Sequence, residues 1–114
     1  MNERDLDSMA SMASEALHRA FIDNGTKDQY LLPEELFDSL LHTLRQLVLH
    51  SDDPLKERLL SLYVYCIKES DKVKNENFYG SSEWVNIRTA VKSFLLHIVE
   101  FDLEAWEKRE LINF

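Results

Sequence analysis

WVNIRTAVKSFLLHIV, residues 84–99, is the stretch that decides the fold class. Its apolar side chains return every three or four residues, which is the spacing of one face of an α-helix. Ser81 or Ser82 precedes the stretch, and a serine at this place caps a helix by accepting a backbone N–H. The pattern predicts a long amphipathic helix whose apolar positions are Trp84, Val85, Ile87, Val91, Phe94, Leu95, Ile98 and Val99.

The same spacing predicts a first helix over about residues 4–23, ended by Asn24-Gly25, because both residues tolerate a left-handed C-cap. Its apolar stripe comprises Leu6, Met9, Met12, Ala13, Ala16, Leu17, Ala20 and Phe21. A second helix is expected to begin at Pro33, since proline suits the first helical position. Its apolar face comprises Leu36, Phe37, Leu40, Leu41, Leu44, Leu47 and Val48.

Ser51-Asp52-Asp53-Pro54 predicts a compact turn, after which Asp53 caps and Pro54 opens a third helix. The short link makes the second and third helices antiparallel neighbours. This third helix carries Leu55, Leu59, Leu60, Leu62, Tyr63, Cys66 and Ile67, and residues 69–83 are expected to contain the longest loop. Towards the end of the chain, Asp102 either caps a short fifth helix, or the fourth helix bends and continues.

No stretch alternates apolar and polar residues in the manner of a strand, and the chain contains only two Gly and two Pro. Its 114 residues suit one domain. We therefore predict an all-α fold, an antiparallel bundle of four to five helices, as a single domain over residues 1–114.

The formal charge is −8, and it is unevenly distributed. Residues 1–57 hold five basic and twelve acidic side chains, a net −7, whereas residues 58–114 hold eight and nine, a net −1. Such a field repels phosphate backbones and anionic lipid and attracts basic partners. The alternative is that the charge serves only solubility.

Neither an apolar leader at the N-terminus nor a run of about 18 to 20 apolar residues is present, so we expect a cytoplasmic protein without a membrane span. Cys66 is the single cysteine, which excludes an internal disulfide, and it falls on the apolar side of its helix. We expect a buried structural thiol.

Motifs for chemistry are weak. Glu15 and His18 have the Glu-x-x-His spacing of di-iron bundles, but the second candidate, His97 with Glu100, has the reversed order. There is no glycine-rich phosphate loop and no signature around Cys66. The lysines near Tyr79, at positions 68, 72 and 74, are interleaved with acidic residues. We expect no enzyme, no metal or other cofactor, and no binding of nucleic acid.

Two features instead favour a protein-binding surface. The first is acidic, with Glu34, Glu35 and Asp38 at the start of the second helix and Asp52 and Asp53 beyond its end. The second is aromatic: Phe78 and Tyr79 stand in a polar stretch, and aromatic side chains are typical binding anchors. Alternatively, Phe78 folds back and closes the end of the bundle, so we expect Tyr79 to be the more exposed of the two. The predicted partner-binding residues are Glu34, Glu35, Asp38, Asp52, Asp53 and Tyr79.

In size, acidity, capped bundle helices and lack of an export signal or catalytic motif, the whole chain resembles the small helical immunity proteins of bacteria. These protect a cell from its own bacteriocin or contact-delivered toxins, many of which are basic nucleases. The resemblance implies a tight one-to-one complex that covers the active cleft of a cognate, basic toxin domain. Opposite charges would speed the association.

The alternative is a small adaptor or regulatory module that acts through a homodimer or through an apolar groove between helices. A third hypothesis, an enzyme or metal protein with a site inside the bundle, is the least supported by the residues.

Overall fold

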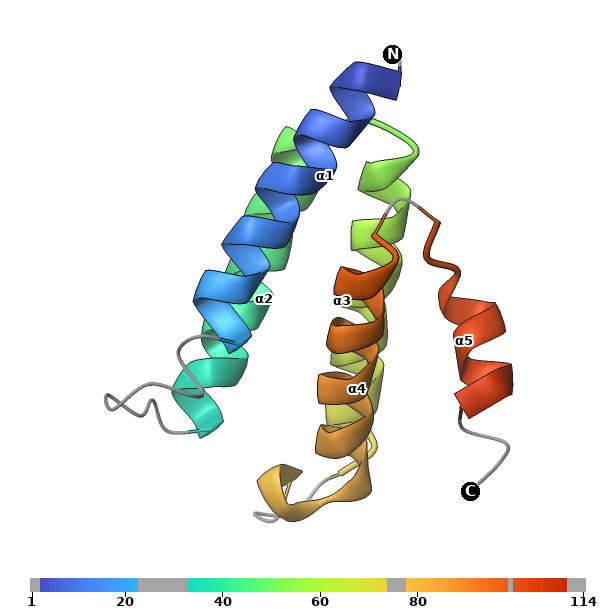
Figure 1. The fold of residues 1–114 in the computed structure, drawn as a ribbon. Coiled ribbons are helices and arrows are strands. Elements are labelled where there is room, and N and C mark those ends of the chain that lie inside the picture. Colours follow the sequence, from blue (N-terminus) through green and yellow to red (C-terminus); the bar gives the residue numbers. More distant parts are fainter. Residues whose placement is uncertain (1–2, 23–32, 74–77, 99, 111–114) are drawn as a thin grey trace.

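The computed structural model describes residues 3–22, 33–73, 78–98 and 100–110, and every regular element within these ranges is helical (Figure 1). The all-α prediction is therefore confirmed. In chain order the elements are α1 (Glu3–Leu17), a π-helical turn (His18–Ile22), α2 (Pro33–His50), α3 (Leu55–Asp71), a 3₁₀ turn (Phe78–Gly80), α4 (Ser82–Leu96) and α5 (Leu103–Glu110).

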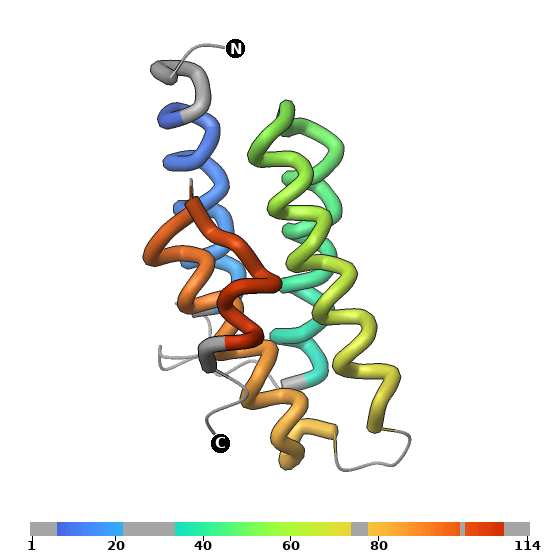
Figure 2. The backbone as a smooth tube through the Cα atoms, turned by 90° about the vertical axis from the view of Figure 1, so that its right-hand side faces the viewer, coloured from blue at the N-terminus to red at the C-terminus, as the bar shows by residue number. Residues whose placement is uncertain are grey.

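The first four helices alternate in direction and pack as an antiparallel bundle, as Figure 1 shows. Helix α2 packs against α1 and α3, and α3 packs against α4 as well. Helix α5 lies outside this group, against α3. Figure 2 views the molecule from the side of α5 and shows it in front of the other helices.

Side chains from all five helices and both turns form one core. Full burial of a Leu, Ile or Phe side chain stabilises a fold by roughly 1.5–3 kcal/mol, so this core is the main source of stability. Its fully buried members include Leu17, Leu40, Leu44, Leu55, Leu59, Leu62, Cys66, Ile87, Val91 and Phe94. None of the helices within the described ranges is long and apolar enough to cross a membrane.

Among the described side chains of the predicted apolar stripes, three are exposed. Met12, Leu60 and Val85 are 67%, 45% and 55% exposed. Each has a buried neighbour in sequence, Ala13, Leu59 and Trp84 respectively, and successive helical residues point about 100° apart. The stripes drawn from sequence were therefore wider than the buried faces.

The observed helix ends test the predicted boundaries of the third, fourth and fifth helices. Ser81, rather than Ser82, caps α4, because its Oγ accepts the backbone N–H of Trp84 at 3.3 Å. Helix α3 starts after Pro54 without a side-chain cap, so the prediction that Asp53 caps it was wrong. Helices α4 and α5 are separate, and Asp102 Oδ1 accepts the backbone N–H of Ala105 at 3.2 Å. The predicted end at Asn24-Gly25 lies outside the described residues.

Candidate partner-binding surface

Three acidic residues occupy the start of α2. Glu34, Glu35 and Asp38 are all exposed. Glu34 and Glu35 lie in the first turn, where carboxylates interact favourably with the positive end of the helix dipole. Asp38 lies one turn further, four residues from Glu34 and on the same face, where two like charges repel each other by a few tenths of a kcal/mol. Helix stability therefore does not account for the acid at position 38.

Tyr79 reaches this acidic end from the 3₁₀ turn before α4. Its side chain is only partly buried, whereas that of Phe78 is 9% exposed and closes the end of the bundle. The pKa of Tyr79 is raised, first by burial and then by the negative charges of Glu34 and Asp38. The structure thus brings Glu34, Asp38 and Tyr79 into one neighbourhood, although Tyr79 follows Asp38 by 41 positions in the sequence. We call these three residues the acidic–aromatic surface.

An aromatic cluster beneath Tyr79 holds it in place. The ring of Trp84 lies 5.3 Å from that of Tyr79, 5.7 Å from that of Phe78 and 5.9 Å from that of Phe21, measured between centroids. Phe37 of α2 lies 5.7 Å from Trp84, nearly perpendicular to it. Such edge-to-face pairs add about 0.5–1.5 kcal/mol each beyond burial. Tyr79 is therefore presented on a rigid platform.

The π-helical turn is fastened to α2 beside this cluster. Ser39 Oγ donates a hydrogen bond to the backbone oxygen of Ala20 at 3.1 Å, which joins the turn to the helix. This contact fixes the backbone next to Phe21, whose ring meets Trp84 of α4. Side chains from α2, α4 and both turns thus build the support of Tyr79.

The other two predicted partner-binding residues lie elsewhere. Asp52 and Asp53 are exposed and follow the last residue of α2, His50. The 18 residues of α2 span about 27 Å, so this pair lies at the opposite end of the bundle from Glu34. The predicted acidic residues therefore form two separate patches, and only the one at the start of α2 includes an aromatic side chain.

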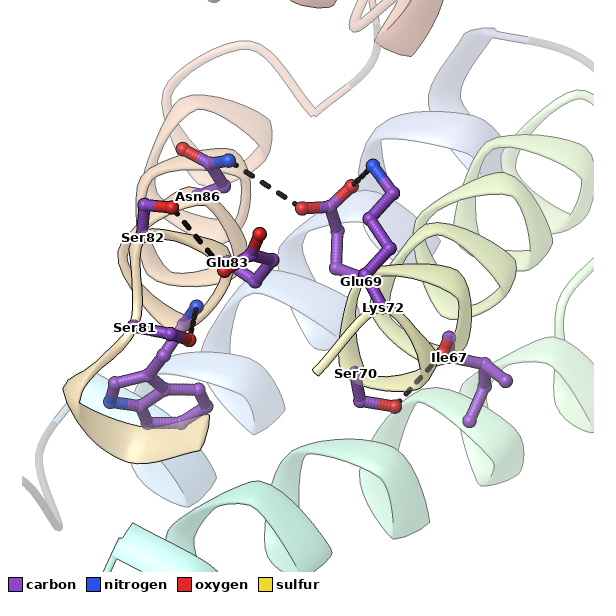
Figure 3. A network of polar contacts seen from close by, with 9 residues as sticks. Ile67, Glu69, Ser70, Lys72, Ser81, Ser82, Glu83 and Asn86 are labelled. Carbon is purple, nitrogen blue, oxygen red and sulfur yellow. Dashed lines mark hydrogen bonds and ion pairs between the residues drawn. The ribbon is translucent and has the colours of Figure 1, made fainter. Parts of the chain in front are cut away.

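A buried carboxylate, whose burial the sequence did not predict, joins α3 to α4 (Figure 3). The side chain of Glu69 is buried; its Oε1 accepts a hydrogen bond from Lys72 Nζ at 2.6 Å, and its Oε2 one from Asn86 Nδ2 at 3.5 Å. The hydrogen bond between Lys72 and Glu69 raises the pKa of Lys72. Glu69 opens a polar stretch in the sequence, and only the approach of α4 buries it.

The residues considered as catalytic or metal-binding candidates are either buried in the core or exposed on the surface. Glu15 pairs with Arg19 at 2.8 Å on the exposed side of α1, and His18 is exposed beside it. Within the described ranges, no three His, Cys, Asp or Glu side chains are grouped so that they could hold a metal ion. Cys66 is fully buried as predicted, and burial raises its pKa to about 12, which keeps the thiol protonated and unreactive at neutral pH.

These features define the class of protein: a small all-α bundle that presents an acidic surface with an aromatic residue on a rigid support. Comparison with protein-family models, with curated proteins and with solved structures gave no match.

Proposed function

We propose that this protein is a protein-binding inhibitor of the immunity type. It would act in the cytoplasm and neutralise a basic, nuclease-type toxin by covering the active cleft of that toxin. The observation that supports the proposal is that Phe37 of α2 packs against Phe78 beside Tyr79, with ring centroids 5.4 Å apart, and that Glu34 and Asp38 lie near enough to Tyr79 for their charges to raise its pKa. This arrangement combines an electrostatic and an apolar means of binding on one face.

The acidic charges account for fast association with the toxin. A nuclease cleft is cationic because it holds phosphate, and carboxylates placed like phosphates compete for the same groups. A chain of net charge −8 approaches such a cleft under attraction, which raises the association rate. An antidote gains from fast association because the toxin acts as soon as it is free.

Tyr79 accounts for slow dissociation of the complex. Tyrosine is enriched among the residues that contribute most to binding, and such residues lie in rigid, well-packed surroundings. The contacts of Tyr79 with Phe78 and Trp84 restrict its ring before any partner binds. Little conformational entropy is then lost on association, so the complex dissociates slowly.

The test begins with the reading frames that flank the gene, where a basic toxin domain is expected. Association of the purified toxin domain with the wild-type chain is measured by stopped flow at low and high salt. We expect the association rate to fall at least about tenfold with salt, and the double variant Glu34→Lys/Asp38→Lys to lower it similarly at low salt. Tyr79→Ala should mainly raise the dissociation rate.

The matched control is Asp7→Lys/Glu15→Lys, which changes the charge equally on exposed positions of α1 that belong to neither proposed binding surface. If this variant slows association as much as Glu34→Lys/Asp38→Lys, net charge alone drives binding and the acidic–aromatic surface is not the site. An association rate indifferent to salt and to both variants would contradict the proposed function.

A further inference from the structure

A groove runs between α3 and α5, on a face of the molecule that the acidic–aromatic surface does not include. It consists of two adjoining hollows of about 520 and 370 Å³, and both are lined by Glu57, Ser61, Leu103 and Glu107. Along α3 the lining extends from Pro54 to Lys68. We call it the α3–α5 groove, and a groove between helices is what the adaptor alternative requires.

The α3 side of the groove has the shape of a helix-binding face. Its lining positions 54, 57, 58, 60, 61, 64, 65 and 68 follow the three- and four-residue steps of a single helical face. This face is about 21 Å long, which matches a partner helix of about four turns. Next to one another along it, Leu60 and Val64 remain 45% and 39% exposed. Apolar side chains at this spacing are the usual anchors for a helix in a groove.

A buried polar group without a partner lies in the same groove. Tyr65 lines it and is only 5% exposed, yet its hydroxyl has no hydrogen-bond partner among the described residues. Burial raises the pKa of Tyr65, so the hydroxyl keeps its proton at neutral pH and can donate one hydrogen bond. Because this hydroxyl is shielded from solvent, Tyr65 forms part of the floor of the groove, and the exposed apolar contacts are left to Leu60 and Val64.

The charges of the groove select the partner. Five carboxylates line the larger hollow, from Glu57, Glu100, Asp102, Glu104 and Glu107, with one cation, Arg58. Lys108 approaches Glu104 at 3.7 Å, but both side chains are largely exposed, so water screens the pair. The groove is negative overall, and a cationic occupant complements it.

We propose that the α3–α5 groove binds a basic amphipathic helix of a partner protein. The apolar side of this helix contacts Leu60 and Val64, and its lysines or arginines face Glu57 and Glu107. This inference does not depend on the proposed immunity function, because a different face carries it.

A second copy of the chain is a poorer occupant. The outer face of α4 has apolar ends, Val85 and Leu96, and two exposed cations, Arg88 and Lys92, which resemble the required helix. However, a contact between α4 of one copy and the groove of another is head-to-tail and leads to open chains of molecules. Two copies of charge −8 also repel each other.

The test uses a synthetic 18-residue helical peptide of leucine and lysine, with leucine at three- and four-residue steps. The same design with glutamate in place of lysine serves as the control peptide. Two-dimensional NMR on the ¹⁵N-labelled full chain locates the binding site, and calorimetry measures the affinity. We expect shifts in the amides of α3 and α5, and no binding of the glutamate peptide.

Two charge-reversal variants decide the site. Glu57→Lys/Glu107→Lys should weaken binding of the lysine peptide at least about tenfold, whereas Glu34→Lys/Asp38→Lys should change it by less than about twofold. Equal weakening of peptide binding by both double variants would overturn the inference, and so would amide shifts confined to helices other than α3 and α5. It would also be overturned if sedimentation showed a dimer of the wild-type chain that dissociates in Glu57→Lys/Glu107→Lys. Toxin binding by the second variant is measured separately, so the two proposals fail independently.

Discussion

Lys72 Nζ lies 2.6 Å from Oε1 of Glu69, but the two side chains are unequally exposed, at 60% for Lys72 and 4% for Glu69. A buried carboxylate therefore depends on a cation that stands largely in water. The third member, Asn86, reaches the same carboxylate from α4 at 3.5 Å (Figure 3). Loss of the cation and loss of the carboxylate should then have different consequences.

Lys72→Met should destabilise the protein more than Glu69→Gln. The lysine variant leaves a buried charge with a single weak partner, which costs about 1–3 kcal/mol, whereas glutamine removes the charge and leaves Lys72 in solvent. Urea unfolding at pH 7 measures both changes. The control is Lys92→Met on the exposed face of α4, expected within about 0.5 kcal/mol of wild type. A larger loss in Glu69→Gln than in Lys72→Met would contradict this account.

Ser81→Ala should cost about 1 kcal/mol, because the Ser81 hydroxyl accepts the backbone N–H of Trp84 in the first turn of α4. The adjacent Ser82→Ala is a matched control, since the Ser82 hydroxyl is exposed and contacts only the neighbouring Glu83. That variant should stay within about 0.5 kcal/mol of wild type. The two variants are compared by thermal and urea unfolding, and equal losses would show that the cap contributes nothing.

Trp84→Ala should lower the free energy of unfolding by about 3–5 kcal/mol, because Trp84 joins the rings from α2 and both turns at the bundle end. Trp106→Ala removes an equally buried ring, but one that meets only Tyr65 among the aromatic residues described. We expect its main effect to be faster amide hydrogen exchange in α5, with a smaller loss of global stability. Similar urea midpoints for both variants would contradict this expectation and show that loss of the α5 packing destabilises the whole bundle equally.

Stability should fall in alkaline solution. Burial raises the pKa of Cys66 to about 12 and also raises that of Tyr65, while the hydrogen bond to Glu69 raises that of Lys72. Each folded pKa lies above its unfolded value, so the folded chain holds more protons at high pH. Stability is complete below the unfolded pKa and is lost as pH rises, beginning near the ordinary thiol value of 9.0.

The thiol alone contributes a slope of up to about 1.4 kcal/mol per pH unit above that point. Urea unfolding between pH 7 and 10.5 measures the decline, and Cys66→Ala should make it shallower. The absolute stability of this variant also changes, because a small cavity forms, so the pH dependence is the quantity to compare. A decline of unchanged slope would mean that the thiol ionises equally in both states.

The sequence predicted the secondary structure well because helical periodicity is a local property. The return of apolar residues every three or four positions determined the all-α class, and the preference of proline for the first helical position gave the start of α2 at Pro33. It also predicted the burial of residues such as Ile87, Val91 and Phe94, which the structure confirms. Periodicity did not show the width of each buried face, so Met12 and Val85 were included wrongly.

The candidate surface was predicted in its residues but not in its arrangement. Glu34 and Asp38 share a helix face, which sequence spacing alone determines. Their approach to Tyr79 and the burial of Glu69 depend on how α2, α3 and α4 pack. These are contacts between segments far apart in the chain, and their geometry follows from filling one shared core, which no single segment specifies.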